Sequence, residues 1–158
     1  MTVRRLAAVD AQTYWMSAKI PNDQFLLYGF DGVPDDLERA VADVGDRAAR
    51  CDELRLRVRD GNGLAYPAWE FGDVAGQFTT HELDDNSWRG CLATVGRLAH
   101  DQLDPRVWPW RLHIFGPVVG IPGASGTGTV AVLQMSHVLA DGARSSALAA
   151  RLFGRAVD

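Results

Sequence analysis

A strongly apolar run that ends in a histidine-bearing turn constrains this chain more than any other stretch. Residues 129–135 are Thr-Val-Ala-Val-Leu-Gln-Met, and an alanine-rich segment occupies residues 143–153. Between them, residues 136–142 are Ser-His-Val-Leu-Ala-Asp-Gly. A short apolar run predicts a buried strand, and the alanine-rich segment predicts a helix. The sequence therefore predicts a central strand, a tight turn that presents His137, and a helix that begins near Asp141.

Apolar spacing predicts the other elements of the chain. We expect three further helices, at residues 6–18, 34–50 and 86–103, and five further strands, at residues 24–30, 54–58, 64–69, 77–83 and 110–115. The Asp-Gly-Asn-Gly segment at residues 60–63 predicts a hairpin turn. Because helices and strands alternate without a linker, the predicted class is α/β or α+β. We expect one domain over residues 1–158, in which two layers are formed by a mixed β-sheet and the helices packed on it.

Composition excludes several classes of function. The net charge is −4 and the chain has no basic stripe, which argues against nucleic acid as the main partner. Hydrophobic residues make up 47% of the chain, which excludes a disordered protein. Cys51 and Cys91 form no C-x-x-C motif, so a reduced, cytoplasmic chain is the simplest interpretation. No apolar run approaches the length of a membrane span, so any lipid contact is expected to be peripheral.

His137 and Asp141 are the strongest candidates for a functional site. A neutral imidazole at the end of a central strand can reach a cleft, and its pKa lies near working pH. The alternative is structural, with a histidine at a strand end and an aspartate that caps a helix. On either interpretation Asp141 orients the turn and does not react. The remaining histidines, His81, His100 and His113, have no metal-ligand spacing, so we expect no metal site.

The loop at residues 120–128 is rich in glycine but does not predict a phosphate site. It lacks a G-K-[ST] motif and precedes a strand, whereas a phosphate-binding loop precedes a helix. Ser125 lies in no G-x-S-x-G motif, so a hydrolase nucleophile is unsupported. We expect a flexible connection here.

Three segments, in order along the chain, resemble one enzyme family. Residues 6–11, Leu-Ala-Ala-Val-Asp-Ala, followed by Tyr-Trp-Met at 14–16, resemble an opening L-x-x-x-D-A helix. Residues 103–110, Leu-Asp-Pro-Arg-Val-Trp-Pro-Trp, resemble an L-D-x-x-x-P-L-W entry to a strand. Residues 136–142 resemble an H-H-x-x-x-D-G motif. The chain thus resembles the N-terminal half of bacterial wax ester synthase/diacylglycerol acyltransferases, in the superfamily of chloramphenicol acetyltransferase-like and condensation-domain enzymes.

The resemblance implies a role for each motif residue. His137 matches the general base, and Asp141 and Gly142 match positions with a structural role. Ser136 replaces the first histidine of the family motif. The implied reaction transfers an acyl group from acyl-CoA, as a substrate and without a cofactor, to a long-chain alcohol or diacylglycerol. It also implies peripheral contact with the inner membrane or lipid droplets.

The resemblance further implies that this chain supplies only half of an active site. The superfamily forms its tunnel between two halves, so activity requires a C-terminal half, a second chain or self-association. Two alternatives remain open. One is a non-catalytic binding or scaffold domain with the same fold, and the other is a condensation-type enzyme that uses carrier-protein thioesters.

Overall fold

A four-stranded mixed sheet forms the centre of the molecule. The computed structural model describes residues 4–61 and 63–155. The sheet has the order β2 (Gln24–Asp31), β7 (Thr127–Met135), β6 (Trp110–Val119) and β5 (Phe78–His81). Its neighbours pair antiparallel except β5 and β6, which are parallel. The apolar run that ends at the motif is therefore a central strand, as predicted, and the mixed α+β class is confirmed.

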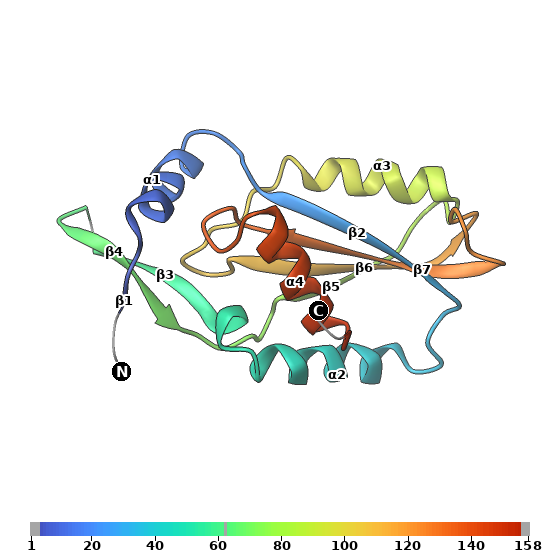
Figure 1. Cartoon of the computed structure of the whole chain (residues 1–158). Coiled ribbons are helices and arrows are strands. Elements are labelled where there is room, and N and C mark those ends of the chain that lie inside the picture. The colour runs from blue at the N-terminus through green and yellow to red at the C-terminus, as the bar shows by residue number, and fades with distance from the viewer. Residues whose placement is uncertain (1–3, 62, 156–158) are drawn as a thin grey trace.

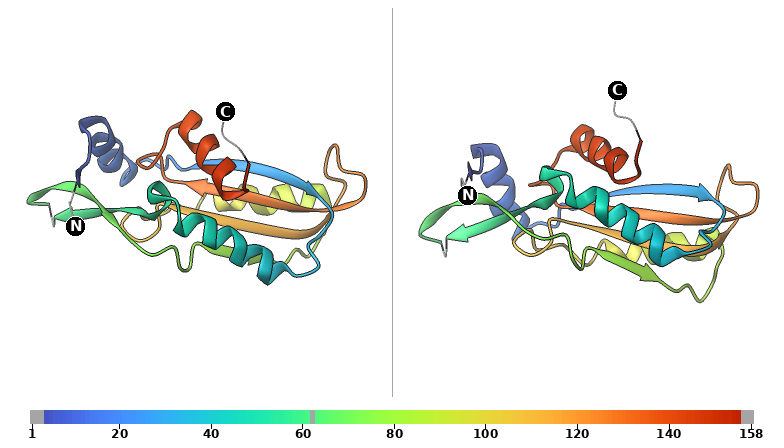
Figure 2. Two further views of the ribbon diagram at one scale, coloured as in Figure 1. Left: turned by 60° about the horizontal axis from the view of Figure 1, so that its bottom comes forward. Right: turned by 90° about the horizontal axis from the view of Figure 1, so that it is seen from below.

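Helices cover both faces of this sheet because the apolar residues of β7 point alternately to each side. Ala131 and Leu133 belong to the core beneath α2 (Leu37–Ala49) and α4 (Gly142–Leu152). Val130 and Val132 belong to a second core beneath α3 (Trp88–Leu98). Figures 1 and 2 show α2 and α4 on one side of the sheet and α3 on the other.

A smaller sheet lies at one end of the molecule, so the strands form two sheets and not the single sheet expected. Its order is β1 (Arg4–Arg5), β4 (Ala65–Phe71) and β3 (Leu56–Gly61), with all neighbours antiparallel. Strands β3 and β4 pair with each other as a hairpin, and β1 pairs with β4. Strand β1 was not predicted from the sequence, because its two residues carry no periodicity. Helix α1 (Ala8–Ser17) lies beside this sheet (Figure 1). The predicted turn at 60–63 includes residue 62, which lies outside the described residues.

Several element boundaries differ from the predictions for local reasons. The side chain of Asp36 accepts a hydrogen bond from the Arg39 N–H, so α2 begins at Leu37 and not at Pro34. A 3₁₀ helix, η1 (Asp52–Arg55), precedes β3. Helix α3 ends at Leu98, and the segment between it and β6 consists of turns and irregular chain. No helix among the described residues has both the length and the apolar character needed to cross a bilayer.

Candidate functional site

His137 is an exposed residue in an otherwise buried turn. It follows β7 after one residue, and its neighbours Ser136, Val138 and Leu139 are each 2% exposed or less, whereas His137 itself is exposed. Burial of those neighbours anchors the turn to the core, because each apolar side chain removed from water stabilises the fold. The turn therefore presents one imidazole to the solvent from a rigid support.

Hydrogen bonds fasten the turn at both ends. The Ser136 N–H donates to the Pro109 carbonyl oxygen at 2.8 Å, and the Leu139 N–H donates to the Ser136 carbonyl oxygen at 3.0 Å. At the other end, the Gln24 Nε2 donates to the Ala140 carbonyl oxygen. Gln24 lies at the start of β2, so strand β2 and the connection before β6 both hold the turn in place.

Asp141 connects the turn to helix α4. It is the N-cap residue, and its Oδ1 accepts a hydrogen bond from the Arg144 N–H at 3.0 Å. This contact satisfies one of the unpaired N–H groups at the helix start. Gly142 is the first residue of the helix, with open space around the position of a Cβ atom. Asp141 thus contacts backbone and leaves the imidazole of His137 without a carboxylate from this motif.

A charged cluster ties α4 to the η1 segment near the turn. Glu53 accepts from Arg144 Nη2 at 2.9 Å through Oε1 and from Arg151 Nη1 at 2.8 Å through Oε2. Both pairs are exposed enough to be screened by water and salt, so each contributes little to folding. Their effect is to fix the direction of the Arg144 side chain beside the motif.

A cavity of about 660 Å³ adjoins the motif segment. Leu139 of the turn and Arg144 of α4 line it, together with apolar side chains of the smaller sheet, including Trp69 and Phe71. Its rim carries charges of both signs, from Arg4, Asp10, Asp52 and Glu53. An apolar floor with a charged rim is the usual composition of a small-molecule site.

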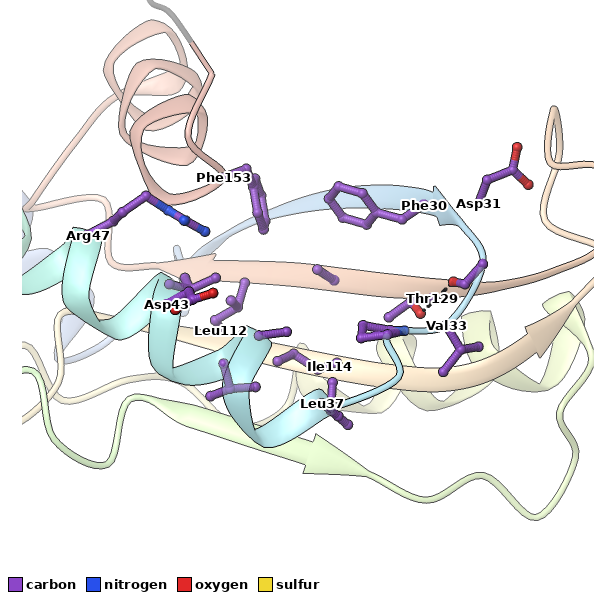
Figure 3. A pocket seen from close by; sticks show the side chains of 16 residues that line it. Phe30, Asp31, Val33, Leu37, Asp43, Arg47, Leu112, Ile114, Thr129 and Phe153 are labelled. Carbon is purple, nitrogen blue, oxygen red and sulfur yellow. Dashed lines mark hydrogen bonds between the residues drawn. The ribbon is translucent and has the colours of Figure 1, made fainter.

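A second cavity has a volume of about 500 Å³ (Figure 3). It runs between α2 and α4 over β6 and the first half of β7, and its apolar lining includes Phe30, Leu37, Ile114 and Phe153. The lining residue of β7 nearest the motif is Ala131. Strand β7 continues for four residues beyond Ala131, about 13 Å, before the turn begins. The turn contributes Leu139 to the first cavity and no residue to this groove, and His137 itself lines neither of the two.

A polar cluster that was not predicted from the sequence lies on the α3 face of the sheet. His81 Nε2 lies 2.8 Å from His113 Nδ1, and His113 Nε2 lies 2.9 Å from Gln134 Oε1. The parallel pairing of β5 with β6 brings the two histidines together from positions 32 residues apart. Burial, and then the nearby Arg111 charge, lower the pKa of His81. Burial is also the main cause that lowers the pKa of His113.

His100 is the remaining histidine outside the motif. It is exposed just after α3 and belongs neither to the Glu53 cluster nor to the His81–His113 cluster. Trp110 packs in the core with its Nε1 donating to the Leu54 carbonyl oxygen at 2.8 Å, as expected for a structural tryptophan. Among residues 4–61 and 63–155, no group of three or more histidine, cysteine, aspartate or glutamate side chains is placed to hold a metal ion.

Solved structures with a similar arrangement of elements include condensation domains. The starter condensation domain of rhizomide synthetase RzmA matches 96% of this chain with a TM-score of 0.76 and 14% identity. The condensation domain of the Monacolin K polyketide synthase MokA matches 100% of it with a TM-score of 0.71 and 14% identity. A chain in the complex of the X-domain and OxyB from teicoplanin biosynthesis matches 100% with a TM-score of 0.74 and 16% identity.

The chain has the condensation-domain fold. It spans 36%, 36% and 35% of those three chains, so it corresponds to about a third of each. These matches show the fold and do not single out the wax ester synthases. No protein-family model and no curated protein matches the sequence.

Proposed function

We propose that this chain is the histidine-bearing part of an acyltransferase that acts on an acyl thioester. The observation that carries the proposal is the exposed imidazole of His137 on an otherwise buried turn, at the end of a central strand of a condensation-domain fold. One structure with this fold is the RzmA starter condensation domain in complex with C8-CoA, which favours a thioester as the acyl donor.

The chemistry needs one base and no covalent enzyme intermediate. His137 accepts the proton of the attacking alcohol or amine as that nucleophile adds to the thioester carbonyl carbon. The tetrahedral intermediate then collapses, the carbon–sulfur bond breaks, and the imidazolium returns the proton to the departing thiolate. Donors to the oxyanion have to be placed where its charge develops. The remaining two thirds of the fold supply much of the second wall of the site.

Two acceptors are compatible with this mechanism. A long-chain alcohol or diacylglycerol gives the wax ester synthase/diacylglycerol acyltransferase reaction, with acyl-CoA as donor. An amine gives a condensation reaction, with the donor on CoA or on a carrier protein. The RzmA variant in complex with C8-CoA and Leu-SNAC favours the second class of acceptor. Supplying radiolabelled acyl-CoA with each acceptor in turn, and with a loaded carrier protein, distinguishes the two.

The test of the base is His137→Ala in the assembly that contains the rest of the fold. We expect the rate of acyl transfer to fall by about 10²–10⁴, the usual contribution of a general base. His100→Ala is the matched control, because His100 is also exposed but lies outside the motif. Equal rates in the His137→Ala variant and the unmodified protein would falsify the assignment.

A non-catalytic docking domain is the second candidate. Ser136 stands where the family motif has its first histidine, and one structural neighbour is a chain of the complex of the X-domain and OxyB. This candidate predicts stable binding of a partner protein that His137→Ala leaves unchanged. It also predicts no turnover of acyl thioesters in the complete assembly, which is the opposite of the result expected for the enzyme.

A further inference from the structure

A third cavity, on the α3 face of the sheet, contains an arginine, Arg111, that forms no ion pair with another described residue. It has a volume of about 370 Å³ and is lined by His81, His113, Arg111 and Gln134, with Trp108 and residues 101–104 of the segment after α3 forming the opposite wall. We call it the His81–Arg111 cavity. It contains no residue of the His137 turn, so a ligand bound in this cavity is independent of the acyltransferase proposal.

The hydrogen bonds in this cavity fix where each proton lies. Gln134 Nε2 lies 2.8 Å from Asp23 Oδ2 and 2.7 Å from the Asp101 carbonyl oxygen. Both oxygens are acceptors, so the side-chain atom that faces them is the amide nitrogen, which donates to both. The amide oxygen of Gln134 therefore faces His113 Nε2, which must carry a hydrogen. In a neutral ring this leaves His113 Nδ1 as an acceptor, so His81 Nε2 donates to it.

One ring nitrogen of this hydrogen-bonded cluster takes no part in its hydrogen bonds. With its Nε2 proton directed at His113, a neutral His81 has a bare Nδ1 atom that forms no hydrogen bond with the described residues. The cluster takes up one proton at that atom without breaking any hydrogen bond. Such a proton turns His81 into a second cationic donor beside Arg111.

Arg111 lacks the partner that such a group normally has. Its guanidinium carbon lies 4.3 Å from the centre of the Trp108 ring, and its Nε is buried without a hydrogen-bond partner. None of the five ion pairs among the described residues includes it. An unpaired buried donor on a charged group is costly, and such groups in native proteins are usually satisfied by water or by a ligand.

The carboxylates around the cavity do not neutralise the charge of Arg111. Asp104 is engaged by Arg106, whose Nη2 lies 2.7 Å from Asp104 Oδ2. Asp23 accepts from Gln134 and from the Leu103 N–H on the far side of the cluster. The Asp101 side chain is exposed on the rim, where water screens it. No carboxylate among the described residues reaches the Arg111 side chain.

We propose that the His81–Arg111 cavity binds the oxyanion of a small molecule, a carboxylate or a phosphate-type group. Arg111 holds it through the stacked guanidinium, whose planar set of donors suits both groups. His81 becomes the second donor when it takes a proton at Nδ1. Binding of the anion therefore accompanies proton uptake, and affinity rises as the pH falls.

Titration of the 158-residue chain with two probes tests this proposal. Sodium sulfate represents the phosphate-type group and sodium acetate represents the carboxylate, with sodium chloride at equal ionic strength as the reference. The measurements are the imidazole nitrogen resonances of His81 and the Nε–H resonance of Arg111. We expect saturable shifts with at least one probe, tighter at about pH 6 than at pH 8. The tighter probe identifies the class of anion.

Substitutions separate the roles of the two side chains. Arg111→Gln should weaken binding by about tenfold or more, as expected for the loss of charge-assisted hydrogen bonds. His81→Gln keeps Arg111 and should retain binding at pH 8 while losing its increase at pH 6. Arg97→Gln, on the exposed face of α3, is the control and should bind as the unmodified chain does.

Two results overturn the proposal. One is that sodium chloride produces the same saturable shifts, and the other is that Arg111→Gln binds both probes unchanged. If Arg111→Gln does not fold, as judged by circular dichroism, His81→Gln and Arg111→Lys serve instead. A pH dependence that is unaltered in His81→Gln, with full affinity in Arg111→Lys, then counts against it.

Discussion

At the scale of single residues, the motif consists of one exposed imidazole and of neighbouring residues that hold the turn in place. His137 contacts the solvent, whereas Asp141 uses its carboxylate on the backbone of α4. The motif aspartate is therefore a determinant of where the turn ends and the helix begins. Its contribution can be measured apart from that of the imidazole.

Asp141→Ala should destabilise the chain by about 1 kcal/mol, because the N–H that it caps loses its partner. Asp141→Asn keeps an accepting oxygen and should cost less. Asp36→Ala removes the equivalent cap of α2 and is the control. It should cause a similar loss of stability and should leave the His137 turn unaffected. Urea unfolding measures the first quantity, and amide exchange at residues 136–140 measures the second. Equal exchange in both alanine variants would contradict a local role for Asp141.

The His81–His113 pair makes stability depend on pH. The pKa of each is lowered in the folded chain, mainly by burial, so the unfolded chain binds more protons below about pH 6.5. The free energy of unfolding should therefore be highest above that pH and should decrease as the pH falls. Burial raises the pKa of Asp23, which acts in the opposite sense at acidic pH.

Urea unfolding of the unmodified chain and of His113→Gln at several pH values measures this linkage. The substitution should reduce the slope of stability against pH between about pH 5 and 6.5. The His100→Gln variant should keep the original slope, because His100 lies outside the cluster. A slope that is identical in all three proteins would exclude the pair as its source.

At the scale of elements, periodicity predicted those strands and helices that are long enough to show it. The central position of β7 followed from residues 129–135, which are apolar on both faces, and the motif turn followed from the change of pattern after Met135. The pairing of the strands could not be predicted from the sequence. Neither the parallel alignment of β5 with β6 nor the third strand of the smaller sheet has a local signal. For that reason His81 and His113 were interpreted singly, although the structure makes them one cluster.

Strand β2 and helix α4 are joined at the motif by one side chain. Gln24 donates to the Ala140 carbonyl oxygen and its Oε1 accepts from the buried Ser145 hydroxyl at 3.2 Å. Gln24→Leu removes both contacts, and we expect a loss of about 1–3 kcal/mol, since two buried polar atoms lose their partners. Ser145→Ala removes one contact and should cost less. Chemical denaturation gives both values, and faster amide exchange at residues 138–141 is expected only for Gln24→Leu. A loss no greater than that of Ser145→Ala would show that Gln24 does not fasten the turn.

At the scale of the whole molecule, the chain spans about a third of the structures that share its fold and leaves aromatic surface exposed. Trp15 of α1 is 52% exposed and Tyr66 of β4 is 41% exposed, and the two rings meet edge to face with 5.7 Å between their centres. Leu64, at the adjoining hairpin, is 99% exposed. Exposed apolar groups of this kind favour association.

We expect the chain to self-associate in dilute buffer, because this surface lacks a covering partner among the described residues. Light scattering during size-exclusion chromatography measures the mass at several concentrations. The double variant Trp15→Ser, Tyr66→Ser should shift the equilibrium toward the monomer, whereas Leu92→Ser, on the 41%-exposed position of α3, should not. A monomer of unmodified protein at every concentration would contradict the prediction.

The pairing of β2 with β7 has a consequence for the order in which the chain folds. Its first ladder pair joins Gln24 to Met135, more than a hundred residues apart, whereas β6 and β7 are neighbours in the sequence. Closing a long loop costs more conformational entropy than closing a short one, so distant pairings form late. Gln24 begins that late strand and also holds Ala140. During synthesis the histidine turn therefore acquires its final shape only after β2 has paired with β7, the last of these strands to be made.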